Sequence, residues 1–86
     1  MSTPTATEIE TWMVTQLAEI LELSPDEIDI TARFDRYGLD SIAAVSLTGD
    51  LEDWLDYELD PVLMYDYPTI QGVAQHLAEE LSQKVL

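Results

Sequence analysis

The chain has 86 residues, of which 18 are Asp or Glu and three are Lys or Arg, so its formal net charge is −15. This length fits a single domain, which we expect to span residues 1–86 with a helical core over about residues 7–84. Such a charge repels nucleic-acid phosphates and anionic membranes, so neither is expected as a partner. It favours protein partners that carry basic patches and discourages self-association, and we therefore expect a monomer.

The sequence contains no cysteine and one histidine, His76, which excludes disulfides, a thiol nucleophile and a zinc–thiolate site. Residues 1–5 lack the basic and apolar regions of a signal peptide. No apolar run approaches the roughly 20 residues that span a bilayer. We therefore expect a cytoplasmic protein, and the initial methionine with the compact length favours a free-standing chain.

The first helix is predicted over residues 7–23, because apolar side chains recur there at helical spacing on one face. This face contains Ile9, Met13, Gln16, Leu17 and Ile20, with Trp12 at its edge. At its start, either Thr5 and Glu8 or Thr7 and Glu10 have the spacing of a capping box.

A connection of about 17 residues follows, from Ser24 to Asp40, which is longer than most links between helices. Its first four residues, 24–27, fit one capped helical turn that begins with a proline. Ile28, Ile30 and Phe34 are the side chains expected to anchor the rest to the core. The length is compatible with a functional loop and equally with a structural crossover.

The second helix is predicted from Asp40 or Ser41 to Leu55, with Asp40 as its N-cap residue and Gly38 in the turn before it. Its two sides differ in composition. The core stripe consists of Leu47, Leu51 and Leu55, flanked by Ala44 and Thr48, with Trp54 at the edge as a packing residue. The nearly opposite side contains Ile42, Val45 and Gly49.

Two more helices complete the pattern. Asp60-Pro61 predicts a short helix over residues 62–65, and Pro68 precedes a last helix over residues 69–84. The apolar face of that last helix contains Ile70, Val73, Ala74, Leu77 and Leu81. The sequence therefore predicts an all-α fold, a small four-helix bundle of three main helices and one short helix, with a long loop between helices one and two.

Ser41 is the first candidate for chemistry, because its hydroxyl lies in the first turn of a helix directly after a loop. The first backbone N–H groups of a helix are unpaired and carry partial positive charge, which stabilises an attached phosphate. A serine at this position can equally serve only as a cap, so spacing alone leaves both interpretations open.

Exposed apolar residues beside Ser41 suggest a docking surface. Leu47 and its stripe occupy the core side of the helix, so Ile42 and Val45 point away from it, where a neighbouring element could also cover them. Seven acids lie between residues 50 and 66 without a basic residue, and they include Asp50 and Asp53. Together they would steer basic partners to this end of the molecule, although each alone is typical of a solvated surface.

Other functions fit the residues less well. A hydrolase would need Ser41, His76 and an aspartate, but His76 is expected on the solvent side of its helix and the G-x-S-x-G turn is missing. A calcium site at Asp53, Asp56, Glu58 and Asp60 lacks the spacing and the glycine of an EF-hand, so no metal is expected. An unmodified acidic adaptor protein remains an alternative of another class.

Three motifs in the correct order resemble the acyl carrier protein family. Gly38-Leu39-Asp40-Ser41-Ile42 is similar to its G-x-D-S-[L/I] attachment motif, and Phe34 with Tyr37 extends this upstream. The stretch over residues 65–70 resembles the F-x-x-P-T-[I/V] signature before the last helix. The resemblance covers about residues 9–81, nearly the whole chain.

This resemblance implies a carrier that is not itself an enzyme. A phosphopantetheinyl transferase would attach 4′-phosphopantetheine from coenzyme A covalently to Ser41, and the terminal thiol of that arm would hold acyl groups as thioesters. An acyltransferase or an acyl-adenylate ligase would load the arm, and a ketosynthase or other synthase domains would use the cargo. Asp40, Ile42 and Val45 would help these partners to dock.

Single residues near Ser41 indicate which type of carrier protein the chain most resembles. Discrete fatty-acid carriers usually have acids soon after the serine, whereas Ile42-Ala43-Ala44-Val45 has none, and peptidyl carriers tend to have glycine in place of Leu39. The motifs most resemble the polyketide-synthase type. A fatty-acid carrier and the peptidyl carrier domain of a nonribosomal peptide synthetase are the alternatives.

Overall fold

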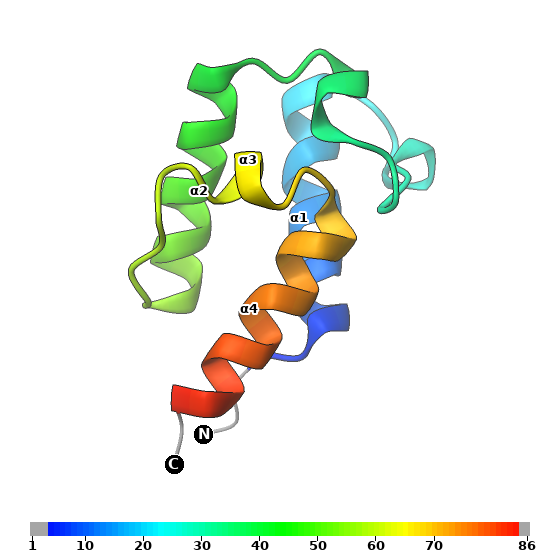
Figure 1. Ribbon diagram of the computed structural model, residues 1–86. Coiled ribbons are helices and arrows are strands. Elements are labelled where there is room, and N and C mark those ends of the chain that lie inside the picture. Colours follow the sequence, from blue (N-terminus) through cyan, green and yellow to red (C-terminus); the bar gives the residue numbers. More distant parts are fainter. Residues whose placement is uncertain (1–3, 85–86) are drawn as a thin grey trace.

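The computed structural model describes residues 4–84, apart from the Lys84 side chain, and it shows the predicted all-α bundle (Figure 1). Within this range there is no strand, only one isolated bridge between Arg33 and Thr69. The elements are α1 (Ala6–Leu21), two 3₁₀ turns η1 (Pro25–Glu27) and η2 (Phe34–Tyr37), α2 (Ser41–Leu55), α3 (Leu63–Asp66) and α4 (Ile70–Lys84).

α1 begins at the first of the two predicted capping boxes. The Glu8 N–H donates to Thr5 Oγ1 at 3.1 Å, and the Thr5 N–H donates to Glu8 Oε1 at 3.0 Å. The helix ends earlier than predicted, because Glu22 adopts a left-handed conformation with φ 58°. Its N–H donates to the Ala18 and Glu19 carbonyl oxygens, so the last turn is closed before Leu23 is reached.

The core contains the predicted apolar faces of the three main helices. α1 packs most extensively against α4, and α2 packs against α3. Fully buried large side chains are Ile9, Met13, Leu17, Leu47, Leu51, Ile70, Val73 and Leu77. The prediction was wrong for Ile20, which is 47% exposed, because the last turn of α1 lies at the edge of the bundle beside the exposed residues 22–27.

The long connection between α1 and α2 is ordered against the start of α4. Ile28 and Phe34 are buried as predicted, and Ile30 packs against the core. The Phe34 N–H donates to the Pro68 carbonyl at 2.8 Å, and the Gln71 N–H donates to the Ile30 carbonyl at 3.0 Å. These contacts satisfy backbone groups that a loose loop would leave to water, so the connection forms a fixed platform before α2.

The remaining helices lie within one residue of their predicted bounds. α3 begins at Leu63 rather than Val62, and α4 begins at Ile70 rather than Thr69. Between α2 and α3 the Glu52 carboxylate accepts the Leu59 N–H at 2.7 Å, which ties the intervening loop to α2. Among the described helices, none is long and apolar enough to cross a lipid bilayer.

Candidate functional site

The backbone before α2 is fixed by η2 and Gly38. The Gly38 N–H donates to the Asp35 carbonyl at 3.1 Å, and Gly38 has φ +74°. No atom lies within 4 Å of the Cβ that another residue would add there, so the left-handed conformation alone accounts for the glycine. Tyr37 also holds the platform, because its hydroxyl accepts the Asp29 N–H at 2.7 Å.

Asp40 is the N-cap of α2, as predicted. Its Oδ1 accepts the Ala43 N–H at 2.8 Å, and its carbonyl accepts the Ala44 N–H at 2.9 Å. The N–H groups of Ser41 and Ile42 have no carbonyl in a preceding helical turn. The positive end of α2 therefore keeps two backbone donors beside the Ser41 side chain.

Ser41 occupies the first position of α2 and is exposed. Its hydroxyl is therefore open to a partner enzyme and is not sealed in the bundle. A phosphate ester on this oxygen would lie close to the free N–H groups of the first helical turn, which stabilise negative charge. The position thus fits a phosphate-linked group both sterically and electrostatically.

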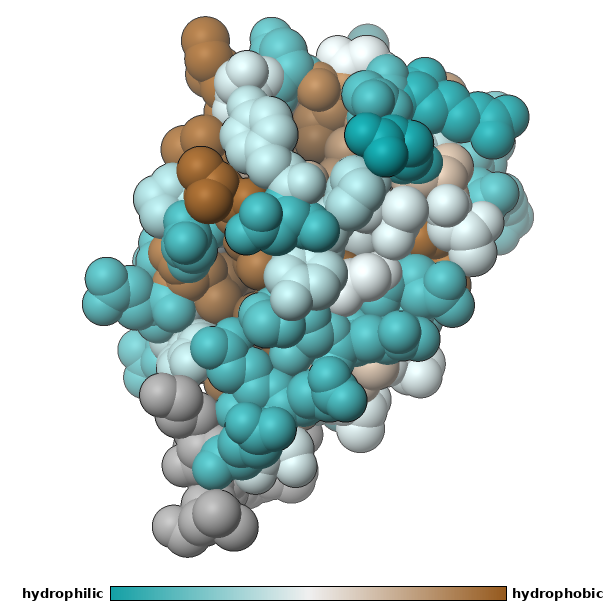
Figure 2. All heavy atoms as spheres, in the orientation of Figure 1, coloured by the Kyte–Doolittle hydropathy of each residue, from teal (hydrophilic) through white to brown (hydrophobic). Residues whose placement is uncertain are grey.

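Exposed apolar side chains lie in the first turns of α2 and at α3, which packs against α2. On α2, Ile42 is 81% exposed and Val45 is 47% exposed, which confirms that they face away from the core. On the α3 side, Val62 is 48% exposed and Tyr65 is 60% exposed. We call these four residues the apolar rim, and Figure 2 shows apolar surface over this upper part of α2 and α3.

Val62 and Tyr65 were not predicted as site residues. The sequence contained a signal for them, because Leu63 and Met64 are adjacent apolar residues that both turn into the core. In a helix of a single turn, the residues that flank such a buried pair point outward. Their closeness to α2, however, depends on the packing of α3, which the chain order alone does not fix.

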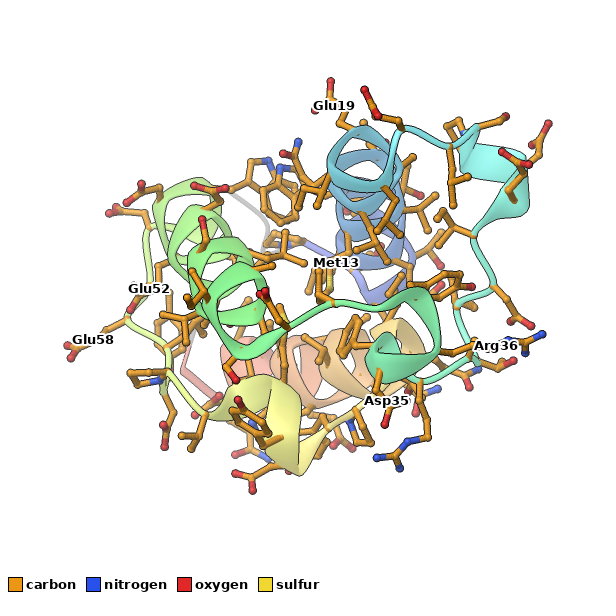
Figure 3. All side chains as sticks on the ribbon, turned by 90° about the horizontal axis from the view of Figure 1, so that it is seen from above. Met13, Glu19, Asp35, Arg36, Glu52 and Glu58 are labelled. Carbon is orange, nitrogen blue, oxygen red and sulfur yellow. The ribbon has the colours of Figure 1, made fainter. Side chains whose placement is uncertain are left out.

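The two acids predicted for docking lie farther from Ser41. Asp50 and Asp53 are exposed. At 1.5 Å per residue they lie about 13 Å and 18 Å along α2 from Ser41. α2 is therefore apolar near Ser41 and acidic toward its other end, where the Glu52 carboxylate accepts the Leu59 N–H and Glu58 projects from the molecule (Figure 3).

His76 differs from its prediction. Only 32% of its side chain is exposed, because Tyr67 stacks on the imidazole with ring centroids 4.3 Å apart. Its Nε2 lies 3.4 Å from Glu80 Oε2, one turn further along α4. Among the residues that the structure describes, no three His, Asp or Glu side chains form a group that could hold a metal ion.

Trp54 packs as predicted but is not buried. It stacks on Trp12 of α1, with ring centroids 5.2 Å apart and an interplanar angle of 15°, and it remains 41% exposed. This contact links α1 to α2 on a part of the surface for which the sequence predicted no function.

Comparison with known proteins gives a consistent result. Residues 11–77 match the family described as the phosphopantetheine attachment site. The chain is 40% identical over 76 residues to the acyl carrier protein TtuC of Teredinibacter turnerae. This match covers 88% of this chain and 87% of that protein. It is also 30% identical over 66 residues to the polyketide synthase PksL of Bacillus subtilis. That match covers 77% of this chain but only 2% of PksL.

Solved structures of carrier proteins share the fold. A free-standing peptidyl carrier protein from Acinetobacter baumannii has a TM-score of 0.84 and 42% identity, over 90% of this chain and 96% of that one. The HMG-ACPI domain of the CurA module from Lyngbya majuscula has a TM-score of 0.85 and 30% identity, over 100% of this chain and 87% of that one.

Proposed function

The chain belongs to the phosphopantetheine attachment site family as an acyl carrier domain, and on that premise we propose that Ser41 is the residue that carries its 4′-phosphopantetheine. The exposed Ser41 side chain at the first position of α2 is the observation that carries this assignment. Asp40 supports it, because its cap on Ala43 leaves the earlier N–H groups free for a phosphate.

The attachment is a group transfer to the Ser41 hydroxyl. The Oγ–P bond forms as the pyrophosphate bond of coenzyme A breaks, adenosine 3′,5′-bisphosphate leaves, and the hydroxyl proton passes to the transferase or to solvent. Ser41 contributes only the accepting oxygen, and the first turn of α2 stabilises the phosphate that results. Once attached, the arm supplies a terminal thiol for thioester formation, a group that a chain without cysteine lacks.

The apolar rim is the proposed contact for the enzymes that act at Ser41. Two of its side chains lie in the first turns of α2 and two lie at α3, which packs against α2, and all four would lose exposed apolar surface on docking. Asp40 adds a negative charge next to the serine. Asp50 and Asp53 act at longer range, by attracting a basic patch on the partner during approach.

The proposed cargo is a polyketide-type acyl intermediate, and the proposed partners are a transferase, a loading enzyme and synthase domains such as a ketosynthase. The similarity to a segment of the polyketide synthase PksL supports this choice, and the similarity to the acyl carrier protein TtuC supports an acyl cargo. Leu39, where peptidyl carriers tend to have glycine, also supports it. The domain itself would catalyse no step, since His76 is engaged by Tyr67 and Glu80.

Intact-mass spectrometry after incubation with coenzyme A and a broad-specificity phosphopantetheinyl transferase tests the assignment. The wild-type chain should gain one phosphopantetheine, and Ser41→Ala should gain none. Ser46→Ala is the matched control, because Ser46 is also an exposed serine of α2 and should be dispensable. Normal modification of Ser41→Ala, or its loss in Ser46→Ala, would contradict the proposal.

The cargo is tested separately with the modified protein. An acyltransferase that uses malonyl-coenzyme A should load it, whereas an amino-acid adenylating enzyme should load it at least about tenfold more slowly, a difference of about 1.4 kcal/mol in transition-state binding. Faster loading with amino acids would favour the peptidyl alternative and leave the attachment site at Ser41 intact.

A further inference from the structure

The stacked pair Trp12–Trp54 forms a second exposed aromatic site. These are the only two tryptophans in the sequence. Trp12 is half-buried, whereas Trp54 keeps 41% of its surface in solvent although it stacks on Trp12. A smaller apolar side chain at residue 54 would fill the contact between α1 and α2 without presenting an indole to water.

The pair faces a different direction from the apolar rim. At about 100° per residue, Trp54 lies about 180° around α2 from Val45, but only about 40° from Asp50. On α1, Glu19 lies about 20° from Trp12 by the same count. In Figure 3, Glu19 projects on the side of the molecule opposite α3, whose neighbourhood contains the rim.

Ile20 extends the site along α1. It is 47% exposed because it lies in the last turn of α1, and it is about 80° around the helix from Trp12. We call Trp12, Trp54, Ile20, Glu19 and Asp50 the tryptophan face. It combines two exposed large apolar side chains with exposed carboxylates on both helices.

The charge of this face limits what can bind to it. Neither α1 nor α2 contains a Lys, Arg or His, whereas each contains three acidic residues. The two arginines, Arg33 and Arg36, lie in the connection between the helices. An anionic ligand or a second copy of this chain would meet only repulsion here, and a cationic partner would be attracted.

We propose that the tryptophan face is a second docking surface, which binds a Lys- and Arg-rich amphipathic helix of a partner protein. The apolar side of that helix packs on Trp54 and Ile20, and its cations pair with Glu19 and Asp50. A guanidinium or ammonium group over the exposed Trp54 ring adds a cation–π contact. Trp54 lies about 120° and 180° around α2 from Ile42 and Val45, so a partner on these two rim residues leaves the tryptophan stack accessible.

A labelled synthetic peptide of about 18 residues, with Leu and Arg on opposite sides of five helical turns, is the probe. Fluorescence anisotropy measures its binding to the full chain. The amphipathic peptide should bind at least about tenfold more tightly than a scrambled peptide of the same composition, which has the same charge but no apolar side. Its binding should also change the emission of the wild-type chain, since all of its tryptophan lies at this site.

Two pairs of variants locate the binding. Trp54→Ala should weaken it by about tenfold, and Trp54→Phe, which keeps the aromatic stack, should recover most of that loss. Asp50→Asn should weaken binding by at least about threefold, because it removes a negative charge at the edge of the proposed interface. Asp66→Asn, which removes the same charge from α3 on the opposite side, should change it by less than about twofold.

Equal binding of the two peptides, wild-type affinity in Trp54→Ala, or equal losses in Asp50→Asn and Asp66→Asn would overturn the proposal. Circular dichroism establishes whether Trp54→Ala folds. If it does not fold, Trp54→Phe and the aspartate pair decide, since exposed substitutions of this kind leave the fold intact. None of these measurements requires modification of Ser41, so their outcome is independent of the proposed attachment site.

Discussion

At the scale of single residues, Asp40 connects the backbone to the proposed chemistry. Its carboxylate caps the Ala43 N–H at 2.8 Å, and this bond fixes where α2 begins. Because the helix begins there, Ser41 is placed at the first helical position and not within a later turn. The charge of Asp40 and its role as a cap are separable properties, and substitutions can distinguish them.

Asp40→Ala should lower the free energy of unfolding by about 1 kcal/mol, because the cap is lost. Asp40→Asn should keep most of that stability, since asparagine caps about as well as aspartate. Urea denaturation measures both. If the charge also guides the transferase, Asp40→Asn will lower kcat/KM for modification while it leaves stability nearly unchanged. Equal destabilisation by both variants would contradict the capping role.

The local features of the site were predictable from short patterns. The Asp40 cap, the position of Ser41 and the capping box of Thr5 and Glu8 each depend on residues within four positions of one another. The left-handed residues Glu22 and Asp56 were not predicted, because neither is a glycine. Their conformations close α1 and α2; an aspartate adopts this conformation only occasionally, and the glutamate carries no compositional signal for it.

At the scale of elements, the sequence predicted only two of the four residues of the apolar rim. Ile42 and Val45 followed from the periodicity of α2, whose core side was identified by its leucines. Val62 and Tyr65 depend on how α3 packs against α2, which is a tertiary property. His76 was assigned incorrectly for the same reason, because Tyr67 reaches it from a segment outside α4.

The double variant Ile42→Ser/Val45→Ser should leave the free energy of unfolding within about 0.5 kcal/mol, since both residues are exposed. It should lower the kcat/KM of the phosphopantetheinyl transferase by about tenfold or more, because the docking contact is lost. The pair Thr7→Ser/Thr15→Ser, on the exposed side of α1, is the control and should retain wild-type kinetics. Unchanged kinetics in the rim variant would contradict the docking role.

The connection between α1 and α2 contains a titratable contact. Asp29 Oδ1 accepts the Thr31 hydroxyl at 2.6 Å and the Thr31 N–H at 2.9 Å, and these bonds lower the pKa of the Asp29 carboxyl below 3.8. Because the folded chain favours the ionised form, Asp29 stabilises the fold at pH values above 3.8. That contribution is lost as the pH falls through the lowered pKa of Asp29.

Thr31→Ala removes the larger of these hydrogen bonds, so the pKa of Asp29 should rise toward 3.8. NMR titration of the Asp29 carboxyl carbon measures this shift directly. Stability near neutral pH should fall slightly, and the loss of stability on acidification should begin at a higher pH than in the wild type. Thr31→Ser, which keeps the hydroxyl, should titrate as the wild type does, and an unchanged Asp29 in Thr31→Ala would refute the assignment.

At the scale of the whole molecule, the net negative charge is the main determinant of contacts between copies. A net charge of −15 on 86 residues produces self-repulsion in the folded state and opposes contact between copies. The charge is unevenly distributed, because seven acids lie between residues 50 and 66 and both arginines lie upstream of Ser41. Partners that act at the proposed attachment site would therefore meet an apolar surface first and an acidic one further along α2.

Added sodium chloride should raise the melting temperature, because screening shortens the range of repulsion from about 30 Å at 0.01 M to about 8 Å at 0.15 M. Over the same range the sedimentation coefficient should be independent of protein concentration, as for a monomer. A melting temperature that falls with salt would show that attractive ion pairs dominate instead. The few pairs in the described residues, such as Arg33–Asp35, make that outcome unexpected.

One particular oxygen, the Ser41 hydroxyl, is proposed to receive the phosphopantetheine group. The sequence contains five serines, at positions 2, 24, 41, 46 and 82. Tandem mass spectrometry of peptides from the modified wild-type chain identifies the residue that carries the added mass. We predict that the mass lies on the peptide containing Ser41 and on that residue alone, and modification at any of the other four serines would contradict the account.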